Sequence, residues 1–287
     1  MTPTLPPLSE VLDLLPDAVC IVDIDGRFLF VSASFERILG YTSEEAVGLC
    51  TFDLVHPEDR AATMNAAKDV MAGELQRHFR NRYIHKHGHI VDIQWSAQYL
   101  SEYGVRIATA REVTELRQAE LALEHLASHD PLTNLPNRHR LQRELKFAIA
   151  HSERTGEGLA VVYLDLDGFK GANDRAGHDA GDHVLREVAQ RLQQGLRQGD
   201  LVARVGGDEF VVLLRGCRDF EAARAIATGL RARLSPPFTL PDRPFQLDAS
   251  VGIACFPADG ADPDALLAHA DRAMYAAKGL VVAPPPG

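Results

Sequence analysis

Long hydrophobic runs and paired cysteines are both missing from this sequence of 287 residues. The longest apolar stretches, such as Leu159–Leu164, are far shorter than the ~20 residues that cross a bilayer. Met1–Pro7 has neither the basic start nor the apolar stretch of a secretory signal peptide. The four cysteines are isolated, so we expect reduced thiols rather than a disulfide framework. These absences predict a cytoplasmic protein that does not enter a membrane.

An excess of basic residues is also missing. Lys and Arg number 30 against 40 Asp and Glu, which gives a formal net charge of −10. A protein that coats nucleic acid needs clustered basic side chains, so we expect no nucleic-acid partner. The charge still permits a small anionic ligand that is held by a local basic pocket and a metal. Hydrophobic residues make up 46% of the chain, which is ordinary for a globular protein, and the length predicts about two domains.

Residues 8–114 predict an α+β domain in which a sheet carries helices on one side. An Asp25-Gly26 turn between two apolar runs indicates a β-hairpin, and three further strand-like runs follow a helical segment. The expected strands are Ala18–Asp23, Phe28–Val31, His78–His85, Ile90–Tyr99 and Val105–Val113. The expected helices are Leu8–Leu15, Ala33–Leu39, Ser43–Val47 with Ser43 as its cap, and His56–Met71.

Residues 115–129 predict a polar helix with a narrow apolar seam. Leu116, Ala119, Leu123 and Leu126 follow 3-4-3 spacing among Glu, Arg and Gln. Such a seam favours a short coiled coil with a second copy, because it is better suited to a partner helix than to a core. The alternative is a single amphipathic helix that packs on its own domain.

Residues 130–282 alternate between helices and strands around one tight hairpin, which is typical of a ferredoxin-like or palm-like α+β domain. The expected helices are Arg138–Glu153, Ala180–Leu196, Phe220–Leu234 and Asp264–Lys278. The expected strands are Leu159–Leu166, Leu201–Val205, Phe210–Leu214 and Phe245–Cys255.

Two acidic clusters carry the chemistry of this second half. Asp165 and Asp167 end an apolar strand and share one face of it, because side chains alternate with period two. The second cluster is Gly206-Gly207-Asp208-Glu209, a turn whose glycines permit close approach of a ligand. If the two strands are neighbours, Asp165 and Asp208 converge on a site suited to Mg²⁺, which favours one or two carboxylates plus substrate phosphates. The alternative for the turn alone is a solvated hairpin tip.

Phosphate and base contacts are expected directly after the first cluster. The segment Gly168-Phe169-Lys170-Gly171 offers backbone N–H groups and a lysine to phosphates. Asp182, which we place at the start of a helix, can accept both N–H groups of the guanine edge, whereas adenine presents an acceptor there. The alternative role of Asp182 is stabilisation of the helix start.

These motifs resemble the GGDEF domain, the catalytic domain of diguanylate cyclases. The matching stretches, in the order and at the spacing of that family, are Asp130–Arg138, Asp165–Asn173, Gly177–Leu185, Arg204–Phe210, Ser250–Ala254 and Ala270–Lys278. The resemblance implies condensation of two GTP molecules into cyclic di-GMP with release of pyrophosphate. It therefore implies a homodimer, since each domain holds one GTP.

The resemblance also implies roles for the matching residues. Mg²⁺ (or Mn²⁺) would be bound by Asp165, the carbonyl of Leu166 and Asp208. Asp208 or Glu209 would help to deprotonate the attacking hydroxyl. The other substrate-binding positions are Phe169, Lys170 and Lys278 for phosphates, Asn173 and Asp182 for guanine, and His178 in the same motif.

Two further features concern regulation and affinity. Arg197-Gln198-Gly199-Asp200 lies where the family has its inhibitory product site, so the resemblance implies inhibition by cyclic di-GMP through Arg197 and Asp200; the alternative is a polar turn. The family usually continues after the lysine with Gly-Arg-Asn, whose Arg contacts the triphosphate. Here Lys278 is followed by Gly279-Leu280-Val281, so one phosphate contact is missing.

Residues 8–114 resemble a PAS sensor domain, through looser motifs. They are Leu15–Ala18, Asp25-Gly26, Ser34–Tyr41, His56–Arg60, Asn81–Tyr83, Gln94–Ser96 and Arg111–Thr114, with Glu112 in place of the usual final Asp. The resemblance implies a homodimer through this domain and the following helix, and regulation by a signal that the sequence does not name. We expect His85, His87 and His89 to be exposed turn residues, His56 and His78 not to hold haem, and Trp95 to lie in the core or on the sheet.

Three functions remain open from the sequence. The first is a diguanylate cyclase that is regulated by its PAS domain and its product. The second is a catalytically weak GGDEF domain that senses GTP or cyclic di-GMP or recruits a partner; the missing arginine favours it. The third is a cyclase that takes ATP in one half-site, against which Asp182 argues.

Overall fold

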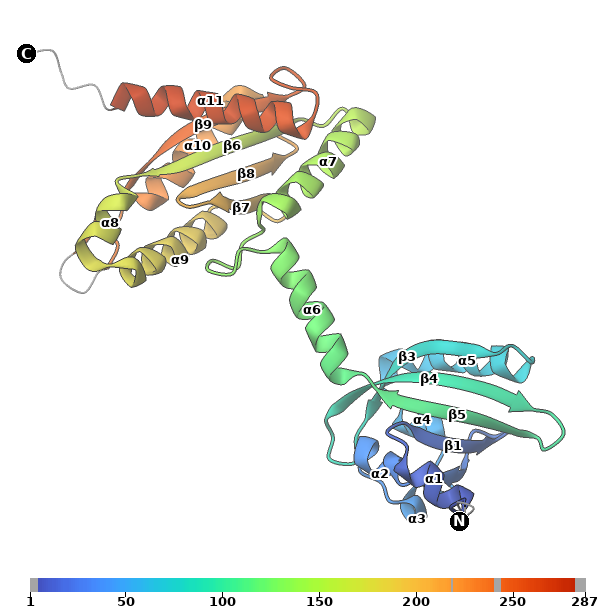
Figure 1. Ribbon diagram of the computed structural model, residues 1–287. Helices are drawn as coiled ribbons and strands as arrows, with labels where there is room; N and C mark the ends of the chain where they lie inside the picture. The colour runs from blue at the N-terminus through green and yellow to red at the C-terminus, as the bar shows by residue number, and fades with distance from the viewer. Residues whose placement is uncertain (1–4, 218, 240–243, 282–287) are drawn as a thin grey trace, which may run out of the picture. The chain divides into compact units, whose positions relative to one another are not determined.

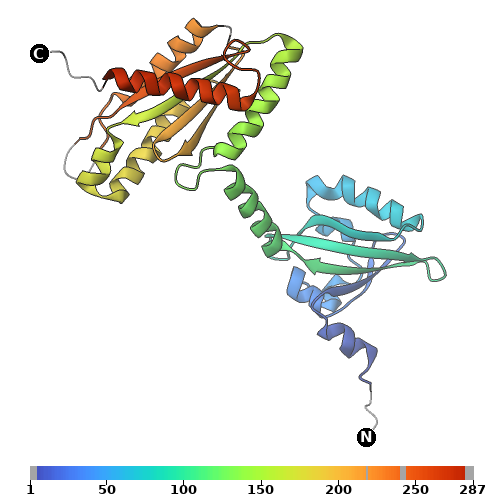
Figure 2. The ribbon, with the colours of Figure 1, turned by 45° about the horizontal axis from the view of Figure 1, so that its top comes forward.

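The computed structural model describes residues 5–217, 219–239 and 244–281. The chain forms two compact units, Met1–Ala122 and Leu123–Gly287, and the division falls inside helix α6 (Thr114–Ser128). Each unit is built on its own antiparallel sheet (Figures 1 and 2). Among the described residues, no helix combines the length and the apolar character that a membrane span requires.

The N-terminal unit is a five-stranded sheet in the order β2-β1-β5-β4-β3, with every neighbouring pair antiparallel. Its strands are β1 (Ala18–Asp23), β2 (Phe28–Val31), β3 (Gln76–Ile84), β4 (Ile90–Leu100) and β5 (Val105–Glu112). Its helices are α1 (Leu8–Leu14), α2 (Ser34–Leu39), α3 (Ser43–Ala46), α4 (Thr51–Leu54), the 3-10 turn η1 (Pro57–Asp59) and α5 (Arg60–Met71). The predicted hairpin and all five strands are present.

The predicted helices of this unit differ from the observed ones near their ends. The expected helix His56–Met71 is a 3-10 turn followed by α5, because His56 caps the turn through Nδ1 and Pro57 occupies its first position. The cap of α3 is Thr42 rather than Ser43, and Thr42 forms a capping box with Glu45. Helix α4 was not predicted, since its four residues are too few to show a helical period.

One apolar core holds the N-terminal unit together. The sheet contributes alternate side chains, and α2 contributes Phe35, Ile38 and Leu39. Phe28 and Phe35 meet edge to face, with ring centroids 5.0 Å apart. Trp95 packs against this core, as expected.

The connecting helix α6 buries none of its residues. Leu116, Leu123 and Leu126 of the predicted seam are exposed, as is Leu121. The seam is therefore not covered by packing within one copy of the described chain.

The C-terminal unit is a four-stranded antiparallel sheet in the order β7-β8-β6-β9, which agrees with the ferredoxin-like or palm-like α+β domain that we expected. Its strands are β6 (Leu159–Asp167), β7 (Leu201–Gly206), β8 (Glu209–Arg215) and β9 (Asp248–Phe256). Its helices are α7 (Arg138–Thr155), α8 (Phe169–Ala176), α9 (His178–Gln194), α10 (Phe220–Leu234) and α11 (Pro263–Val281).

Strand β6 lies at the centre of this sheet and is buried on both faces. Its even-numbered residues, such as Val162 and Leu164, join the cluster that includes α9 and α10. Its odd-numbered residues, such as Val161 and Tyr163, join the cluster that includes α7 and α11. Because the alternation continues to the end of the strand, Asp165 belongs to the α11 face.

Two features of the second unit differ from the expected elements. Helix α8 was not predicted: Gly168 has a left-handed backbone (φ 82°) and the helix begins at Phe169. The expected strand from Phe245 begins only at Asp248, because Phe245 forms an isolated bridge with Phe238 instead.

Gly252 sets the distance between β9 and α11. A Cβ atom at this position would lie 2.0 Å from the carbonyl oxygen of Ala270 and 2.2 Å from the amide nitrogen of Met274. Both atoms belong to the backbone of α11 and cannot turn aside. By contrast, a Cβ at Gly229, on the exposed face of α10, would meet nothing within 4 Å.

Gly252→Ala is therefore expected to push α11 away from the sheet and to destabilise the protein by about 1–3 kcal/mol. Gly229→Ala makes the same chemical change and is expected to stabilise α10 by about 0.5–1 kcal/mol. Calorimetric unfolding of the full chain measures both. An unchanged Tm for Gly252→Ala would show that α11 does not rest on this glycine.

Candidate active site

Carboxylates gather where β6 ends. Asp165 is buried (8% exposed) and is paired in register with Glu209 of β8 on one side and Ser250 of β9 on the other. The amide of Leu166 donates to the backbone carbonyl of Asp208 at 3.2 Å. The two predicted strands are therefore neighbours, and their acidic clusters meet.

The Gly206-Gly207 turn is held in place by Arg204. The guanidinium donates to the carbonyl of Gly207 at 2.8 and 3.0 Å and forms an ion pair with Asp130 at 2.9 Å. Asp130 also accepts hydrogen bonds from the amide and hydroxyl of Thr133. Burial opposes ionisation of Asp130, but the bonds from Thr133 and Arg204 outweigh it and lower its pKa. The turn is thus tied to the segment that precedes α7.

Lys278 brings a positive charge from α11 to this cluster. Its Nζ lies 2.5 Å from Oδ1 of Asp165. The hydrogen bond to Asp165 raises the pKa of Lys278, and the charges of Asp167 and Asp208 act in the same direction. Lys278 is therefore charged; it contacts Asp165 and is close enough to Asp167 and Asp208 to be affected by their charge.

Asp208 is poorly accommodated as an anion. Burial raises the pKa of its carboxyl, and the neighbouring charge of Asp165 adds to the effect. Lys278 and Arg204 only partly offset this. A further cation at this position would stabilise the ionised form.

Two neighbours orient the other acids. The hydroxyl of Ser250 donates to both carboxylate oxygens of Asp167, at 2.9 and 3.0 Å. The hydroxyl of Tyr163 donates to Oε2 of Glu209 at 3.0 Å. Burial and the charge of Glu209 raise the pKa of Tyr163, so it remains a donor. Glu209 is thereby fixed on the same face as Asp165.

The carboxylates of this cluster suit a hard cation that takes only some of its ligands from the protein. In the described part of the chain, no group of three or more His, Cys, Asp or Glu side chains is arranged as a metal site. Asp165 and Asp208 supply two carboxylates, and the charge of Asp165 contributes to the raised pKa of Asp208. Two carboxylates without further side chains match Mg²⁺, which takes its remaining ligands from water and phosphates.

The base-contact residues lie on the α8–α9 hairpin. A Cβ at Gly181 would lie 1.9 Å from Oδ1 of Asn173 and 3.2 Å from the ring of Phe169, so only glycine permits this packing. Asn173 is therefore adjacent to the turn of α9 that carries Asp182. Asp182 is the fifth residue of α9, beyond its first turn. The expectation that Asp182 starts a helix is wrong, and a helix-start role is excluded with it.

The other predicted substrate residues lie at the ends of the same hairpin. Phe169 is 9% exposed and belongs to the core, whereas Lys170 beside it is exposed on the first turn of α8. His178 is exposed at the first position of α9. The amide N–H groups of Gly168–Gly171, which we expect to contact phosphates, lie at the N-terminus of α8.

Arg197 and Asp200 form a turn next to β7, with an Nε–Oδ2 distance of 3.4 Å. The side chain of Arg197 is 62% exposed, whereas that of Asp200 is 3% exposed. Asp200 accepts the amide of Arg215 at 3.1 Å. Arg197 is presented to solvent, and Asp200 also has a structural role.

Four residues of the site had no role predicted from the sequence. They are Ser250, which pairs with Asp165 in the sheet, Tyr163, which precedes Asp165 by two residues, Arg204, which precedes the Gly206-Gly207 turn, and Asp130, which forms an ion pair with Arg204. Arg204, Asp130 and Ser250 were inside the matching motifs, and the strand period places Tyr163 on the face of Asp165. Their partners depend on strand register, which the sequence alone does not give.

Asp208→Asn and Asp130→Asn are expected to change stability in opposite directions. The raised pKa of Asp208 means that its ionised form is disfavoured by folding, so the Asn variant should have a higher Tm at pH 7. The lowered pKa of Asp130 contributes stability above the ordinary carboxyl range, so its Asn variant should lose about 1 kcal/mol, or 2–4 °C.

The gain in Asp208→Asn should shrink as the pH falls toward 4, because the raised pKa of Asp208 lets the wild-type carboxyl take up a proton there. The loss in Asp130→Asn should persist at pH 4 and shrink only at lower pH, because the pKa of Asp130 lies below the ordinary carboxyl value. Calorimetric scans from pH 3 to 8 measure both differences. Destabilisation by Asp208→Asn at pH 7 would contradict the proposed repulsion between Asp208 and Asp165.

Comparisons with known proteins cover both units. Residues 127–280 match the family model "Diguanylate cyclase, GGDEF domain", and residues 28–108 match the model of the PAS fold. A probable diguanylate cyclase of Escherichia coli K12, DgcE, is 33% identical over 284 residues, which are 94% of this chain and 25% of that protein. A cyclic di-GMP phosphodiesterase of the same strain, PdeR, is 32% identical over 94% of this chain and 41% of its own length.

Solved structures match the C-terminal unit. A sensory box/GGDEF family protein from Caulobacter crescentus is 43% identical, with a TM-score of 0.52, over 53% of this chain and 99% of that one. The coiled coil and GGDEF domain of DgcB from the same species, in complex with c-di-GMP, is 29% identical. Its TM-score is 0.53 over 58% of this chain and 88% of that one.

The chain spans between 24% and 32% of the length of the first three curated relatives. The family match covers more than half of the chain and includes every acid of the cluster, the turn that Arg204 holds, and Lys278. The chain therefore belongs to the GGDEF diguanylate cyclase domain family and carries a PAS-fold domain before its GGDEF domain.

Proposed function

We propose that this protein is a diguanylate cyclase that condenses two GTP molecules into cyclic di-GMP and two pyrophosphates. The observation that carries the proposal is the convergence of Asp165, Asp208 and Lys278 at the end of β6. Carboxylates that repel each other next to a single lysine do not stabilise the fold, but they can bind a cation and a triphosphate. Their arrangement therefore favours a binding or catalytic role over a structural one. Family membership supports the same conclusion.

Asp165, Asp208 and the carbonyl of Leu166 would hold Mg²⁺ or Mn²⁺. The metal, when bound, supplies positive charge to the phosphate oxygens and to the attacking hydroxyl. Lys278, which forms an ion pair with Asp165, would also contact the phosphates. Lys170, exposed at the start of α8, would contact the same phosphates.

The chemistry is a nucleotidyl transfer that each of the two nucleotides undergoes once. The 3′-oxygen of one GTP attacks the α-phosphorus of the other, and the bond to pyrophosphate breaks. The proton of the hydroxyl passes to Asp208 or Glu209. Tyr163 holds Glu209 in position for this step, while Asp167, fixed by Ser250, adds negative charge near Lys278.

Guanine would be bound at the α8–α9 hairpin. Asp182 offers an acceptor to the two N–H groups of the guanine edge, and Asn173 lies beside it against Gly181. Adenine has an acceptor where guanine has its ring N–H, so the same carboxylate disfavours ATP.

Two copies must face each other, because one domain holds one GTP. The exposed leucines of α6 support a homodimer through this helix, and we place a second contact in the PAS domain. A change in the PAS domain would then alter how the two GGDEF domains meet. Solvent-exposed Leu116, Leu123 and Leu126 are the basis for this arrangement.

The second candidate function is a GGDEF domain that binds nucleotide without turnover. The absence of an arginine after Lys278 favours it, since one triphosphate contact is lost. The presence of Asp165, Asp208 and Glu209 in one cluster favours the enzyme.

Asp208→Ala is expected to lower cyclic di-GMP formation from GTP and Mg²⁺ by more than about 100-fold, because the variant removes both a metal ligand and a candidate base. Product chromatography of the purified full chain measures this. Glu221→Ala, which removes a carboxylate that is 69% exposed in α10, is the matched control and should retain wild-type activity.

A wild type that binds GTP but forms no more product than Asp208→Ala would favour the binding module. Formation of the product by Asp208→Ala at the wild-type rate would place the catalytic centre elsewhere.

We also propose that the product inhibits the enzyme at Arg197 and Asp200. Arg197 and Arg215 line a surface cleft of about 1110 Å³, and both present donors that suit a phosphodiester. Product that bridges this cleft to a second domain would hold the half-sites apart without contact with the catalytic acids. Arg197 is the better residue to change, because Asp200 is buried and bonded to the backbone.

Arg197→Ala is expected to form more product at long times, with an initial rate close to that of the wild type. Arg224→Ala is the matched control, since Arg224 is 63% exposed and Arg197 is 62% exposed. Progress curves at saturating GTP, together with calorimetric binding of cyclic di-GMP, test this. If product formation by the wild type and by Arg197→Ala stops at the same amount of cyclic di-GMP, the turn that contains Arg197 and Asp200 does not bind inhibitory product.

A further inference from the structure

Residues 129–137, which we call the junction, connect α6 to α7 and are bonded to both helices. Asn137 caps α7 by accepting the amide of Arg140 at 3.0 Å. It also donates back to the end of α6, from its amide to the carbonyl of Ser128 and from Nδ2 to the carbonyl of Ala127, both at 3.0 Å. The junction therefore holds the end of α6 against the start of α7.

The same junction holds the turn that carries Asp208. The carbonyl of Pro136 accepts the amide of Arg204 at 3.0 Å, and Asp130 forms an ion pair with the guanidinium at 2.9 Å. Arg204 in turn donates to the carbonyl of Gly207. A change at the junction is therefore passed to the carboxylate cluster through Arg204.

His129 is the first residue of the junction, and its contacts fix where its proton lies. Nδ1 is 2.9 Å from the hydroxyl oxygen of Ser128 and 3.2 Å from the carbonyl oxygen of His125. The Ser128 hydroxyl donates to the carbonyl of Glu124, so its oxygen is an acceptor toward Nδ1. Both neighbours of Nδ1 are acceptors, and Nδ1 therefore carries the hydrogen.

The other ring nitrogen of His129 faces a group that can only donate. Nε2 is hydrogen-bonded to Nη1 of Arg140, and a guanidinium has no acceptor atom. Nε2 is therefore the unprotonated nitrogen. Among the described residues, Nε of Arg140 is buried without a partner, so this guanidinium already lacks one hydrogen bond.

The ring of His125 is the second titratable group beside His129. The two rings are stacked, with centroids 4.0 Å apart and an interplanar angle of 13°. Nε2 of His125 lies 2.7 Å from Oδ1 of Asn134 and donates to it. Protonation of His125 would use its other nitrogen and keep this bond, so it would add to the positive charge beside His129.

The acid next to His129 in the sequence does not offset these charges. Asp130 follows His129, but its carboxylate is paired with Arg204. Burial lowers the pKa of His129, and the charges of His125 and Arg140 add to this effect, against the hydrogen bond to the carbonyl of His125. His129 is therefore neutral at pH 7 and takes up a proton only in acid.

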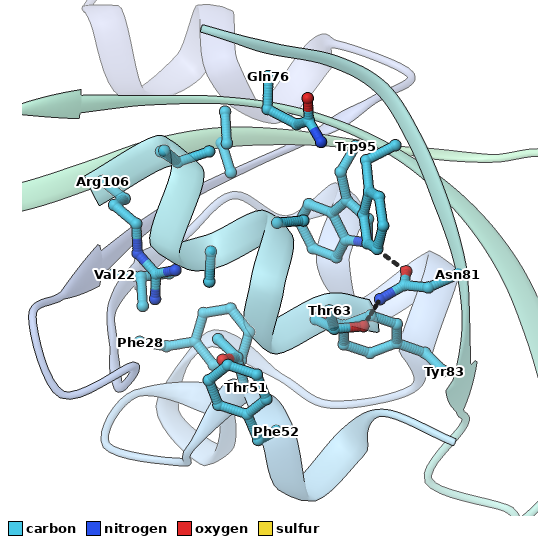
Figure 3. Close-up of a pocket in the computed structure, with 16 residues that line it drawn as sticks. Val22, Phe28, Thr51, Phe52, Thr63, Gln76, Asn81, Tyr83, Trp95 and Arg106 are labelled. Carbon is cyan, nitrogen blue, oxygen red and sulfur yellow. Dashed lines mark hydrogen bonds between the residues drawn. The ribbon is translucent and has the colours of Figure 1, made fainter. Parts of the chain in front are cut away.

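The N-terminal unit contains a polar network of the opposite kind. There, Trp95 Nε1 donates to Oδ1 of Asn81 at 2.9 Å, and Nδ2 of Asn81 donates to the hydroxyl of Thr63 at 2.8 Å (Figure 3). None of these side chains ionises between about pH 5 and 8, so their hydrogen bonds do not depend on pH. The bond between His129 and Arg140 exists only while His129 is neutral.

We propose that His129 and Arg140 form a pH-sensitive switch at the junction. With His129 neutral, the bond between the two side chains ties the end of α6 to α7. A proton on Nε2 places donor against donor and charge against charge, so the bond breaks. The junction then loosens its hold on Asp130 and Arg204. The effect on catalysis rests on the proposed cyclase function, whereas the switch itself does not.

The stability of the C-terminal unit should therefore fall in mild acid. A histidine whose pKa is lowered by folding stabilises the protein above its ordinary value of about 6.5, and this contribution is lost as the pH falls. His129→Gln keeps an acceptor for Arg140 but cannot take up the proton. In calorimetric scans of the full chain from pH 8 to 5, the Tm should fall about 2–4 °C further in the wild type than in His129→Gln.

His139→Gln is the matched control, because His139 is exposed on the same helix as Arg140. The Tm of this control should fall with pH as in the wild type. NMR of the histidine ring protons gives a measurement that does not depend on unfolding, and the signal that is absent from His129→Gln identifies His129. In Arg140→Gln, which removes the facing charge, that signal should titrate at a higher pH than in the wild type.

A third measurement tests the link to the catalytic turn. Cyclic di-GMP formation should fall more between pH 7.5 and 6 in the wild type than in His129→Gln, because only the wild type loses the bond. An equal fall in both proteins would contradict the link from the junction to Arg204. If neither protein forms product at any pH, the proposed function fails, and the calorimetric and NMR measurements still decide whether the switch exists.

Two results would overturn the switch itself. One is a Tm that depends on pH in the same way in the wild type and in His129→Gln. The other is a His129 signal that titrates at the same pH in the wild type and in Arg140→Gln, which would show that the guanidinium does not face Nε2.

Discussion

The C-terminal unit holds carboxylates that repel each other close together at the end of β6. This repulsion is the constraint that the neighbouring groups of the site must balance. Asp165 and Asp208 are brought together by strand pairing, and burial adds to the cost of ionising Asp208. Lys278 offsets part of this cost, and Arg204 holds the turn that carries Asp208. Such an arrangement sacrifices stability in the free protein, and a cation together with a triphosphate would restore it.

The alternation of side chains on β6 turns this constraint into a defined site. Odd positions face α11, so Tyr163, Asp165 and Asp167 share one side with Lys278, while even positions complete the core under α9 and α10. Gly252 lets α11 approach β9 closely enough for Lys278 to reach the acids. The face that carries the acid cluster and the face that packs under α9 and α10 are thus two sides of one central strand.

Much of this could be predicted from the sequence, for identifiable reasons. Strand period placed Asp165 and Asp167 on one face, and the Gly206-Gly207 turn indicated a hairpin. Helix α8 was missed because Gly168 and Gly171 resemble a loop, although Gly168 only starts the helix with a left-handed backbone. The links from Arg204 to Asp130 and from Tyr163 to Glu209 join residues 74 and 46 positions apart, so they depend on tertiary packing that no local pattern contains.

The central claim is that the acid cluster acts on GTP rather than merely binding it. The most direct measurement is the amount of pyrophosphate and of cyclic di-GMP that the purified wild-type chain releases from GTP and Mg²⁺, with ATP in a parallel reaction. The account predicts two pyrophosphates for each cyclic di-GMP and no product from ATP. Binding of GTP without release of pyrophosphate, or pyrophosphate without cyclic di-GMP, would contradict it.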